Sequence, residues 1–237
     1  MVEMSRTVRK ITLSTTPDDA AIKQLRLGDI VYLDGLIYTA REGVYKRALE
    51  ENANIPMDLP QHSAANFHCS PAATIRDDGS FDLGAVTATA SFRFAKWLPE
   101  WIARTGARLI IGKGGMSSQD YKDYFVPNGA VYLSTVGYGT GALLGRGVEN
   151  VEAVHWHEEL GMAQAMWVLK CRNMGPFIVA SDSEGRCLFE RENDRISEKL
   201  GALYDGLPEP TLRRYGETDD RRDELIGPSE SKQTSEQ

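Results

Sequence analysis

Four side chains in this sequence are suited to binding and activating a small anion. Arg41 and Arg93 each follow an apolar segment, and a guanidinium group can hold a carboxylate through two parallel hydrogen bonds. Lys113 lies among glycines and adds a compact positive charge, while Thr89 offers a hydroxyl group close to Arg93 in the sequence. Together the four residues predict a pocket for a small dianion. The sequence offers no obvious general base and no obvious electron-withdrawing group beside them. This indicates that the chemistry needs a partner molecule.

Each of these residues also has an ordinary structural explanation. Lys113, taken alone, is typical of a surface lysine, and the glycines around it lack the spacing of a phosphate-binding loop. Arg41 would ordinarily be solvated or paired with Glu42. Thr89 could simply cap the helix that follows it. Residue types and spacing alone leave these alternatives open.

Strand-like segments precede Arg41 and Lys113. β-Branched and aromatic residues predict a strand over 29–38, just before Arg41, with a bulge or turn at Gly35. A compact apolar strand over 108–111 ends just before Lys113. The neighbouring glycines permit a sharp turn and a close approach of the backbone to a ligand. Both cations are therefore expected where a strand meets a loop.

Helical segments alternate with these strands. Apolar residues spaced three and four apart predict helices over 42–52 and 91–105, the second shortened or kinked by Pro99. Further helices are expected over 16–25, with Thr16 as the N-cap, and over 158–165 and 194–204. Further strands are expected over 64–67, 81–87, 130–134, 166–171 and 177–180. A turn over 76–80 implies antiparallel neighbours, whereas strand-helix-strand passages imply parallel ones.

The composition bounds the domain organisation and excludes several classes of protein. The 237 residues, of which 41% are hydrophobic, suffice for one large core. We expect an α/β domain with a mixed sheet over residues 1–204 and a polar, disordered tail over 205–237. A net charge of -7 argues against a nucleic-acid-binding protein. The sequence has no apolar run long enough for a membrane span and no secretory signal, so we expect a cytoplasmic protein.

The cysteines support neither a disulfide framework nor a cluster site. They are widely separated, form no C-x-x-C arrangement and number three: Cys69, Cys171 and Cys187. The pairs His68-Cys69 and His155-Trp156-His157 are weak candidates for metal ligands, because adjacent or alternating residues without further ligands rarely form a site. We therefore expect no metal site in this chain.

Several segments, in their order and separations, resemble those of a known family. They are Leu27-Gly28-Asp29-Ile30-Val31-Tyr32-Leu33, Tyr38-Thr39-Ala40-Arg41 and Ile111-Gly112-Lys113-Gly114-Gly115-Met116, with weaker matches at Glu159-Leu160-Gly161-Met162 and Gly175-Pro176-Phe177-Ile178-Val179. Over roughly residues 13–200, the chain resembles the β subunit, or C-terminal half, of the class I iron-sulfur hydro-lyases. This group contains class I fumarases and L(+)-tartrate dehydratase. The resemblance implies a swivelling β/β/α domain.

The resemblance also implies a role for each candidate residue. Arg41, in the Tyr-Thr-Ala-Arg segment, would bind a substrate carboxylate, and Lys113 would bind a carboxylate or hydroxyl group. The family's Gly-Pro-Thr-Thr-Ser-x-Arg-Met motif falls on residues 87–94. Thr89 would then be the catalytic threonine and Arg93 the second carboxylate-binding arginine. The motif is altered here, because its glycine, its proline, its second threonine and its methionine are replaced.

In this family, a partner α subunit carries the cysteines of a 4Fe-4S cluster, whose open iron acts as a Lewis acid on the departing hydroxide. The resemblance therefore implies a cluster that this chain does not ligate, and an α2β2-type assembly. The present chain would supply charge and position, since neutralising the carboxylates makes removal of the neighbouring C–H proton less costly. A threonine hydroxyl is a poor base in water, so Thr89 would require activation by nearby cations or partner residues.

The implied function is the reversible dehydration of a hydroxy-dicarboxylate by the β subunit of an iron-sulfur hydro-lyase, with tartrate or malate as first candidates. The stretches 55–59 and 154–156 are closer to tartrate dehydratase than to fumarase. An alternative is a non-catalytic dicarboxylate-binding or regulatory module, which the altered threonine motif keeps open. A cofactor-free lyase is the third option, disfavoured because no histidine is close to the cations in the sequence.

Overall fold

A computed structural model describes residues 8–137, 139–203 and 206 of the chain. Its strands are β1 (Lys10–Ser14), β2 (Ile30–Thr39), β3 (Ala65–Phe67), β4 (Cys69–Ile75), β5 (Phe81–Ala88), β6 (Leu109–Gly112), β7 (Val131–Thr135), β8 (Val148–His155) and β9 (Met166–Ser181). Its α-helices are α1 (Asp19–Lys23), α2 (Glu42–Tyr45), α3 (Leu59–His62), α4 (Leu98–Thr105), α5 (Ser118–Asp120), α6 (Gly141–Arg146), α7 (His157–Leu160) and α8 (Leu188–Leu203). Shorter π- or 3-10-helical segments are η1 (Lys46–Glu50), η2 (Ser91–Trp97), η3 (Tyr121–Phe125) and η4 (Val126–Asn128).

The main sheet mixes parallel and antiparallel strands. Its order is β1-β2-β3-β6-β7-β9-β8, and the strands from β1 to β7 in that order run parallel. The long strand β9 runs antiparallel to β7, to β8 and also to β2. Because β9 pairs with both β2 and β7, the pairings of β2, β3, β6, β7 and β9 form a closed circle. The carboxyl ends of β2, β3 and β6 lie at one edge of the parallel part.

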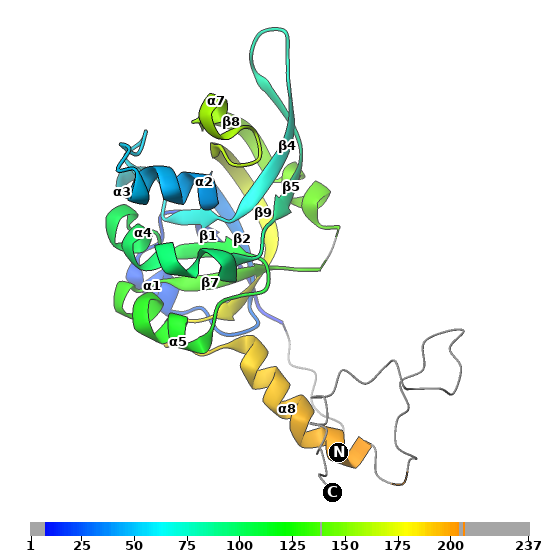
Figure 1. Cartoon of the computed structure of the whole chain (residues 1–237). Helices are drawn as coiled ribbons and strands as arrows, with labels where there is room; N and C mark the ends of the chain where they lie inside the picture. The colour runs from blue at the N-terminus through cyan, green and yellow to red at the C-terminus, as the bar shows by residue number, and fades with distance from the viewer. Residues whose placement is uncertain (1–7, 138, 204–205, 207–237) are drawn as a thin grey trace, which may run out of the picture. The chain divides into compact units, whose positions relative to one another are not determined.

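The strands β4 and β5 form a separate antiparallel hairpin. It extends beyond the main sheet near α7 (Figure 1), and Phe81 packs against Trp167 and His157 with ring centroids 5.0 and 5.9 Å apart. The helices α2, α4 and α5 lie on one side of the sheet (Figure 1). The hairpin therefore leaves the strand edge after β3 and returns the chain to the same edge before η2.

Two hydrophobic clusters occupy opposite faces of the strands. Along β6, Leu109 and Ile111 belong to one cluster and Ile110 to the other, as the two-residue period of a strand requires. The cluster of Leu109 draws on all five strands of the circle, whereas that of Ile110 includes aromatic side chains from the helices, such as Trp101 and Phe125. Each fully buried apolar side chain of this size contributes about 1.5–3 kcal/mol to folding. Both faces of the strands are thus buried, which explains their nearly continuous apolar sequences.

The expected mixed α/β architecture is confirmed, and strands occur at each of the predicted positions. The irregularity expected at Gly35 is also present, as a shift in the pairing of β2 with β9 between Leu33 and Gly35. Gly35 adopts φ +125°, and a side chain there would overlap the hydroxyl group of Thr15. The predicted hairpin turn over 76–80 connects β4 with β5.

Several predicted boundaries are wrong. The two strands expected over 166–171 and 177–180 are a single strand, β9, because the intervening Met174 pairs with Leu33. The last helix begins at Leu188, earlier than expected, and the helix expected over 158–165 ends at Leu160.

The first helix is capped by a different residue than the sequence predicts. The side chain of Asp18 accepts a hydrogen bond from the Ala21 N–H at 2.7 Å, so Asp18 rather than Thr16 is the N-cap. The edge strands β1 and β8 were not predicted, because their polar residues weaken the apolar pattern on which strand prediction depends.

The chain divides into two units after Asp194. The tail expected over 205–237 lies outside the described residues except for Gly206, so the boundary at residue 204 stays a prediction. Among the described helices, none is both long and apolar enough to cross a membrane.

Candidate functional site

Two of the predicted cations lie at the carboxyl ends of parallel strands. Arg41 follows β2 and is the N-cap residue of α2, and Lys113 directly follows β6. The strand β3 lies between β2 and β6 in the sheet. In α/β sheets, the crevice outside the carboxyl ends of the strands is the usual place for a ligand. The expectation that both cations occupy strand-loop junctions is confirmed.

Thr89 reaches the same edge from the hairpin. Its N–H donates to the carbonyl oxygen of His68 at 2.7 Å, and its own carbonyl oxygen accepts from the N–H of Lys113 at 3.1 Å. The N–H of Ser91 then donates to the Lys113 carbonyl oxygen at 3.2 Å, and Ala90 bridges Lys113 in parallel orientation. The segment therefore forms a short strand-like insertion beside the loop that carries Lys113.

Thr89 is not a helix cap. The helical segment after it, η2, begins at Ser91, has Ala90 at its N-cap position and receives no side-chain cap. The alternative explanation of Thr89 is therefore wrong. Its side chain is half-buried at the strand edge, where its hydroxyl group can meet a ligand.

Arg41 combines a fixed position with unused hydrogen-bonding capacity. Its Nη1 donates to the Ala163 carbonyl oxygen at 2.8 Å, while its buried Nε has no hydrogen-bond partner among the described residues. Burial, and then the positive charge of Arg93, lower the pKa of Arg41. A buried N–H without an acceptor is costly, and an incoming carboxylate would satisfy it. The alternative in which Arg41 pairs with Glu42 is not supported, because the Glu42 carboxylate binds Lys46 at 2.6 Å.

Arg93 lies on η2 with an exposed side chain. It is close enough to Arg41 to lower the pKa of that guanidinium, and it contributes, after Lys46, to the lowered pKa of Glu42. Like charges held together favour an anion between them. The structure thus joins the predicted residues in two pairs, Arg41 with Arg93 through their charges and Thr89 with Lys113 through the main chain.

A chain of buried polar side chains backs this edge, and the sequence analysis missed it. The Asn66 side-chain amide donates to the Tyr45 hydroxyl, that hydroxyl pairs with His68 Nε2, and His68 Nδ1 pairs with Ser91 Oγ, each at 2.7 Å. The Tyr132 hydroxyl also donates to Ser91 Oγ at 2.7 Å. All five residues are fully buried. We refer to them as the buried polar chain.

The histidine of the buried polar chain is uncharged at neutral pH. Burial lowers the pKa of His68 to about 3, so one ring nitrogen donates a hydrogen bond and the other accepts one. The sequence does contain a signal for the buried polar chain. Polar and apolar residues alternate at the end of β3, where the apolar Phe67 separates Asn66 from His68 in a short buried segment. Polar side chains on one face of a buried strand must find partners there.

The glycine loop is fitted closely to this chain. A Cβ atom at Gly112 would overlap Ser91 Oγ and lie 2.9 Å from the Tyr132 hydroxyl. At the other end of the loop, the Met116 N–H donates to the Tyr121 hydroxyl at 2.8 Å. The backbone on both sides of Lys113 is therefore in contact with buried hydroxyl groups.

The cysteines of this chain do not fit an iron-sulfur cluster. Cys69, Cys171 and Cys187 are buried free thiols, and the described residues contain no group of three or more His, Cys, Asp or Glu side chains placed for a metal ion. Burial raises the pKa of Cys69 well above its usual value and that of Cys171 to about 12. Cluster ligands are thiolates, so thiols held in this form are poor ligands.

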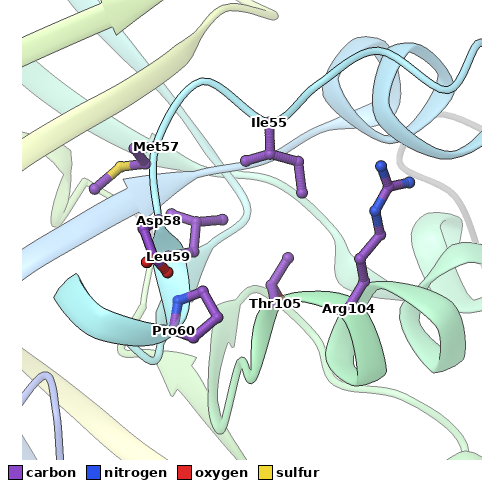
Figure 2. A pocket seen from close by; sticks show the side chains of 7 residues that line it. All are labelled: Ile55, Met57, Asp58, Leu59, Pro60, Arg104 and Thr105. Carbon is purple, nitrogen blue, oxygen red and sulfur yellow. The ribbon is translucent and has the colours of Figure 1, made fainter.

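A cavity of about 260 Å³ opens beside α3 and the end of α4. Figure 2 shows its lining residues, which are Ile55, Met57, Asp58, Leu59, Pro60, Arg104 and Thr105. Arg104 uses its Nη1 to donate to the Ala48 carbonyl oxygen at 2.7 Å. None of the four predicted site residues lines this cavity, and we do not assign the chemistry to it.

Comparison with known proteins identifies the family of this chain. The profile of the family described as Fumarase C-terminus matches residues 1–192. The chain belongs to this family. The match extends into α8, so it includes every strand and both pairs of candidate residues. The resemblance to class I hydro-lyases that the sequence segments predict is confirmed.

Individual relatives carry the names of tartrate dehydratase and fumarate hydratase proteins. A protein of Methanocaldococcus jannaschii, provisionally named L(+)-tartrate dehydratase subunit beta, is 38% identical over 185 residues, which cover 77% of this chain and 92% of that protein. The L(+)-tartrate dehydratase subunit beta of Escherichia coli K12 is 31% identical over 199 residues, or 82% of this chain and 94% of that subunit. A provisionally named fumarate hydratase class I of Geobacillus stearothermophilus is 31% identical over 192 residues, which cover 81% of this chain but 36% of that protein.

Proposed function

We propose that this chain is the β subunit of a hydro-lyase that reversibly dehydrates a hydroxy-dicarboxylate, with L-tartrate as the first candidate. The observation that carries the proposal is the main-chain pairing of Thr89 with Lys113 at a strand edge that also holds Arg41 and Arg93. The relatives named as tartrate dehydratase β subunits support tartrate over other four-carbon acids.

The two arginines divide the substrate between them. Arg41, whose buried Nε has no hydrogen-bond partner in the described part of the chain, receives one carboxylate, and the more exposed Arg93 receives the other. Neutralising both carboxylates relieves the repulsion between the arginines. It also overcomes the long-range repulsion that a chain of net charge -7 exerts on a dianion.

Thr89 acts as the base once its own hydroxyl proton has passed to a residue of the partner chain, and the resulting alkoxide takes the proton from the carbon atom next to a carboxylate and becomes a hydroxyl group again. The electron pair of the broken C–H bond forms the new double bond, and the hydroxyl group on the neighbouring carbon leaves with its own bonding pair. Lys113 lies beside Thr89 in the main-chain pairing, and its positive charge stabilises the Thr89 alkoxide that exists before the transfer. The resemblance assigns the Lewis acid for the leaving hydroxide to a 4Fe-4S cluster on a partner α subunit.

The proposal also includes the fold type, the domain boundary, the cellular location and the assembly of this chain. We assign the domain to the swivelling β/β/α type, place its boundary at residue 204, and expect a cytoplasmic complex of α2β2 type. The mixed sheet and the profile match over residues 1–192 support the first assignment. The names of the relatives as β subunits support an α partner.

Anaerobic co-expression with the cysteine-bearing α chain of the same genome tests the proposal. After cluster reconstitution, absorbance assays with tartrate, malate, fumarate and methylated analogues would compare the pair with each chain alone. We expect turnover of one hydroxy-dicarboxylate that requires both chains. Binding of a dicarboxylate by this chain without turnover by the pair would favour the non-catalytic binding module instead.

A further inference from the structure

The buried polar chain is connected to the proposed base and cation through two separate sets of contacts. In the main chain, His68 accepts from the Thr89 N–H at 2.7 Å and donates its own N–H to the Ile111 carbonyl oxygen at 2.8 Å. In the side chains, His68 Nδ1 and Ser91 Oγ are 2.7 Å apart. Since Ser91 also donates its N–H to Lys113, both partners of the Thr89–Lys113 pairing are attached to this one interaction.

We propose that His68, Ser91 and Tyr132 are positioning residues that hold Thr89 and Lys113 in register for catalysis. This inference rests on the proposed function, because it assigns these residues to the proton transfer by Thr89. They do not touch the substrate and they act through the backbone of the two segments that do.

The geometry distinguishes this role from ordinary core packing. Among the described residues, both His68 Nδ1 and the Tyr132 hydroxyl are within hydrogen-bonding distance of the same atom, Ser91 Oγ. Its approach requires Gly112, because a Cβ atom there would overlap Ser91 Oγ. The hydroxyl group therefore connects the segment of Thr89, the end of β3 and the segment of Lys113 at one point.

Removing the Ser91 hydroxyl group should disturb the alignment of Thr89 more than the binding of the dicarboxylate. Ser91→Ala leaves His68 Nδ1 and the Tyr132 hydroxyl without their partner, so the segment around Thr89 loses a fixed orientation. The arginines are anchored separately, since Arg41 is bound to the Ala163 carbonyl oxygen. A misplaced base lowers the rate of the chemical step, whereas the carboxylate contacts remain.

A matched control is available in Ser63, a second buried serine with two hydrogen bonds. Its hydroxyl donates to the Leu36 carbonyl oxygen at 2.5 Å and accepts from the Ala65 N–H at 3.0 Å. Ser63→Ala removes the same chemical group from a similar environment without touching the buried polar chain. It therefore reports the effect of lost stability alone.

The first arm of the test measures steady-state kinetics of the complex with the α chain. For Ser91→Ala we expect kcat to fall about tenfold or more while KM for the dicarboxylate changes less than about threefold. Tyr132→Phe, which removes the Tyr132 hydroxyl group but keeps the ring and the contact between His68 and Ser91, should give a smaller fall in kcat and serves if Ser91→Ala does not fold. Ser63→Ala should retain the wild-type kcat. Equal kcat values for Ser91→Ala, Tyr132→Phe and the wild type would overturn the inference.

The second arm needs no turnover, so it separates this inference from the proposed function. Amide hydrogen exchange of the full-length chain should show the Thr89 and Lys113 amides protected in the wild type and exchanging about tenfold or more faster in Ser91→Ala. The same amides should be unchanged in Ser63→Ala. If the wild-type complex turns over no substrate but the amides respond in this way, the proposed function fails and the buried polar chain still positions the two segments. Unchanged exchange in Ser91→Ala would overturn the inference whether or not the complex is active.

Discussion

The N–H of Lys113 donates a hydrogen bond of 3.1 Å to the carbonyl oxygen of Thr89. This contact joins the loop after β6 to the segment after the β4–β5 hairpin, and it places the proposed cation next to the proposed base. A main-chain hydrogen bond fixes the relative position of the two segments through their backbones. Substitutions at this edge should therefore separate binding from chemistry.

Arg93→Ala should lower kcat/KM of the reconstituted complex about tenfold or more. The substitution removes a guanidinium group that can hold a carboxylate through charged hydrogen bonds, each contributing about 1.5–3 kcal/mol. The main effect should be on KM. Lys96→Ala is the matched control, because Lys96 is an exposed cation on the same helical segment that pairs with Glu50 at 3.4 Å. Near-normal efficiency of Arg93→Ala, or an equal loss in Lys96→Ala, would contradict the assigned pocket.

Thr89→Val should lower kcat about a hundredfold or more, because it replaces the hydroxyl group with a methyl group of similar size and removes the proton acceptor. Thr89→Ser keeps the hydroxyl group and should retain a substantial part of the activity. Thr87→Val, at an exposed threonine of β5, controls for the loss of a nearby hydroxyl group. The measurement is single-turnover kinetics of the complex, and an active Thr89→Val variant would remove Thr89 from the mechanism.

Gly112→Ala should destabilise the fold by about 1–3 kcal/mol, since the added Cβ atom overlaps Ser91 Oγ and overpacks a buried site. Urea unfolding of the full chain measures the change. Combining Gly112→Ala with Ser91→Ala should recover part of the loss, because the overlapping oxygen is gone. Gly84→Ala, which meets its nearest neighbour at an ordinary 3.6 Å, should have a small effect. Strict additivity of the two substitutions would argue against direct contact.

The stability of the fold should decrease as the pH falls below about 6.5 because of His68. Its pKa is lowered to about 3 in the folded chain, so in this range the unfolded chain binds a proton that the folded chain excludes. The free energy of unfolding should fall by about 2 kcal/mol between pH 7 and pH 5 from this group alone. Urea unfolding at both pH values would compare the wild type with His68→Gln, which lacks the titrating ring. A loss of equal size in His68→Gln would show that other groups cause it.

Much of this edge could be predicted from local sequence. The strand before Lys113 is short and continuously apolar, the strand before Arg41 is rich in β-branched and aromatic residues, and both are followed by charged or glycine residues. The turn over 76–80 is equally clear. These features depend on neighbouring residues only, which is why periodicity and turn chemistry identify them.

The features that sequence reasoning missed depend on contacts between distant segments. Ser91 meets Tyr132 and His68 only once β3, β6 and β7 are paired. The continuity of β9 arises because its middle pairs with β2, although Gly175 and Pro176 suggest a break in the local sequence. The pairing of Thr89 with Lys113 likewise follows from the path of the hairpin, which spacing in the sequence does not encode.

The most direct test of the account compares dehydration rates for three preparations under anaerobic conditions: the α chain alone, the reconstituted wild-type pair, and a pair whose β chain carries Arg41→Ala and Arg93→Ala. L-Tartrate is the first substrate, and formation of oxaloacetate is followed by absorbance. We predict turnover by the wild-type pair, none by the α chain alone, and a kcat/KM at least about a hundredfold lower for the doubly substituted pair. Full activity of the α chain alone, or of the doubly substituted pair, would contradict the claim that this chain supplies the dicarboxylate pocket.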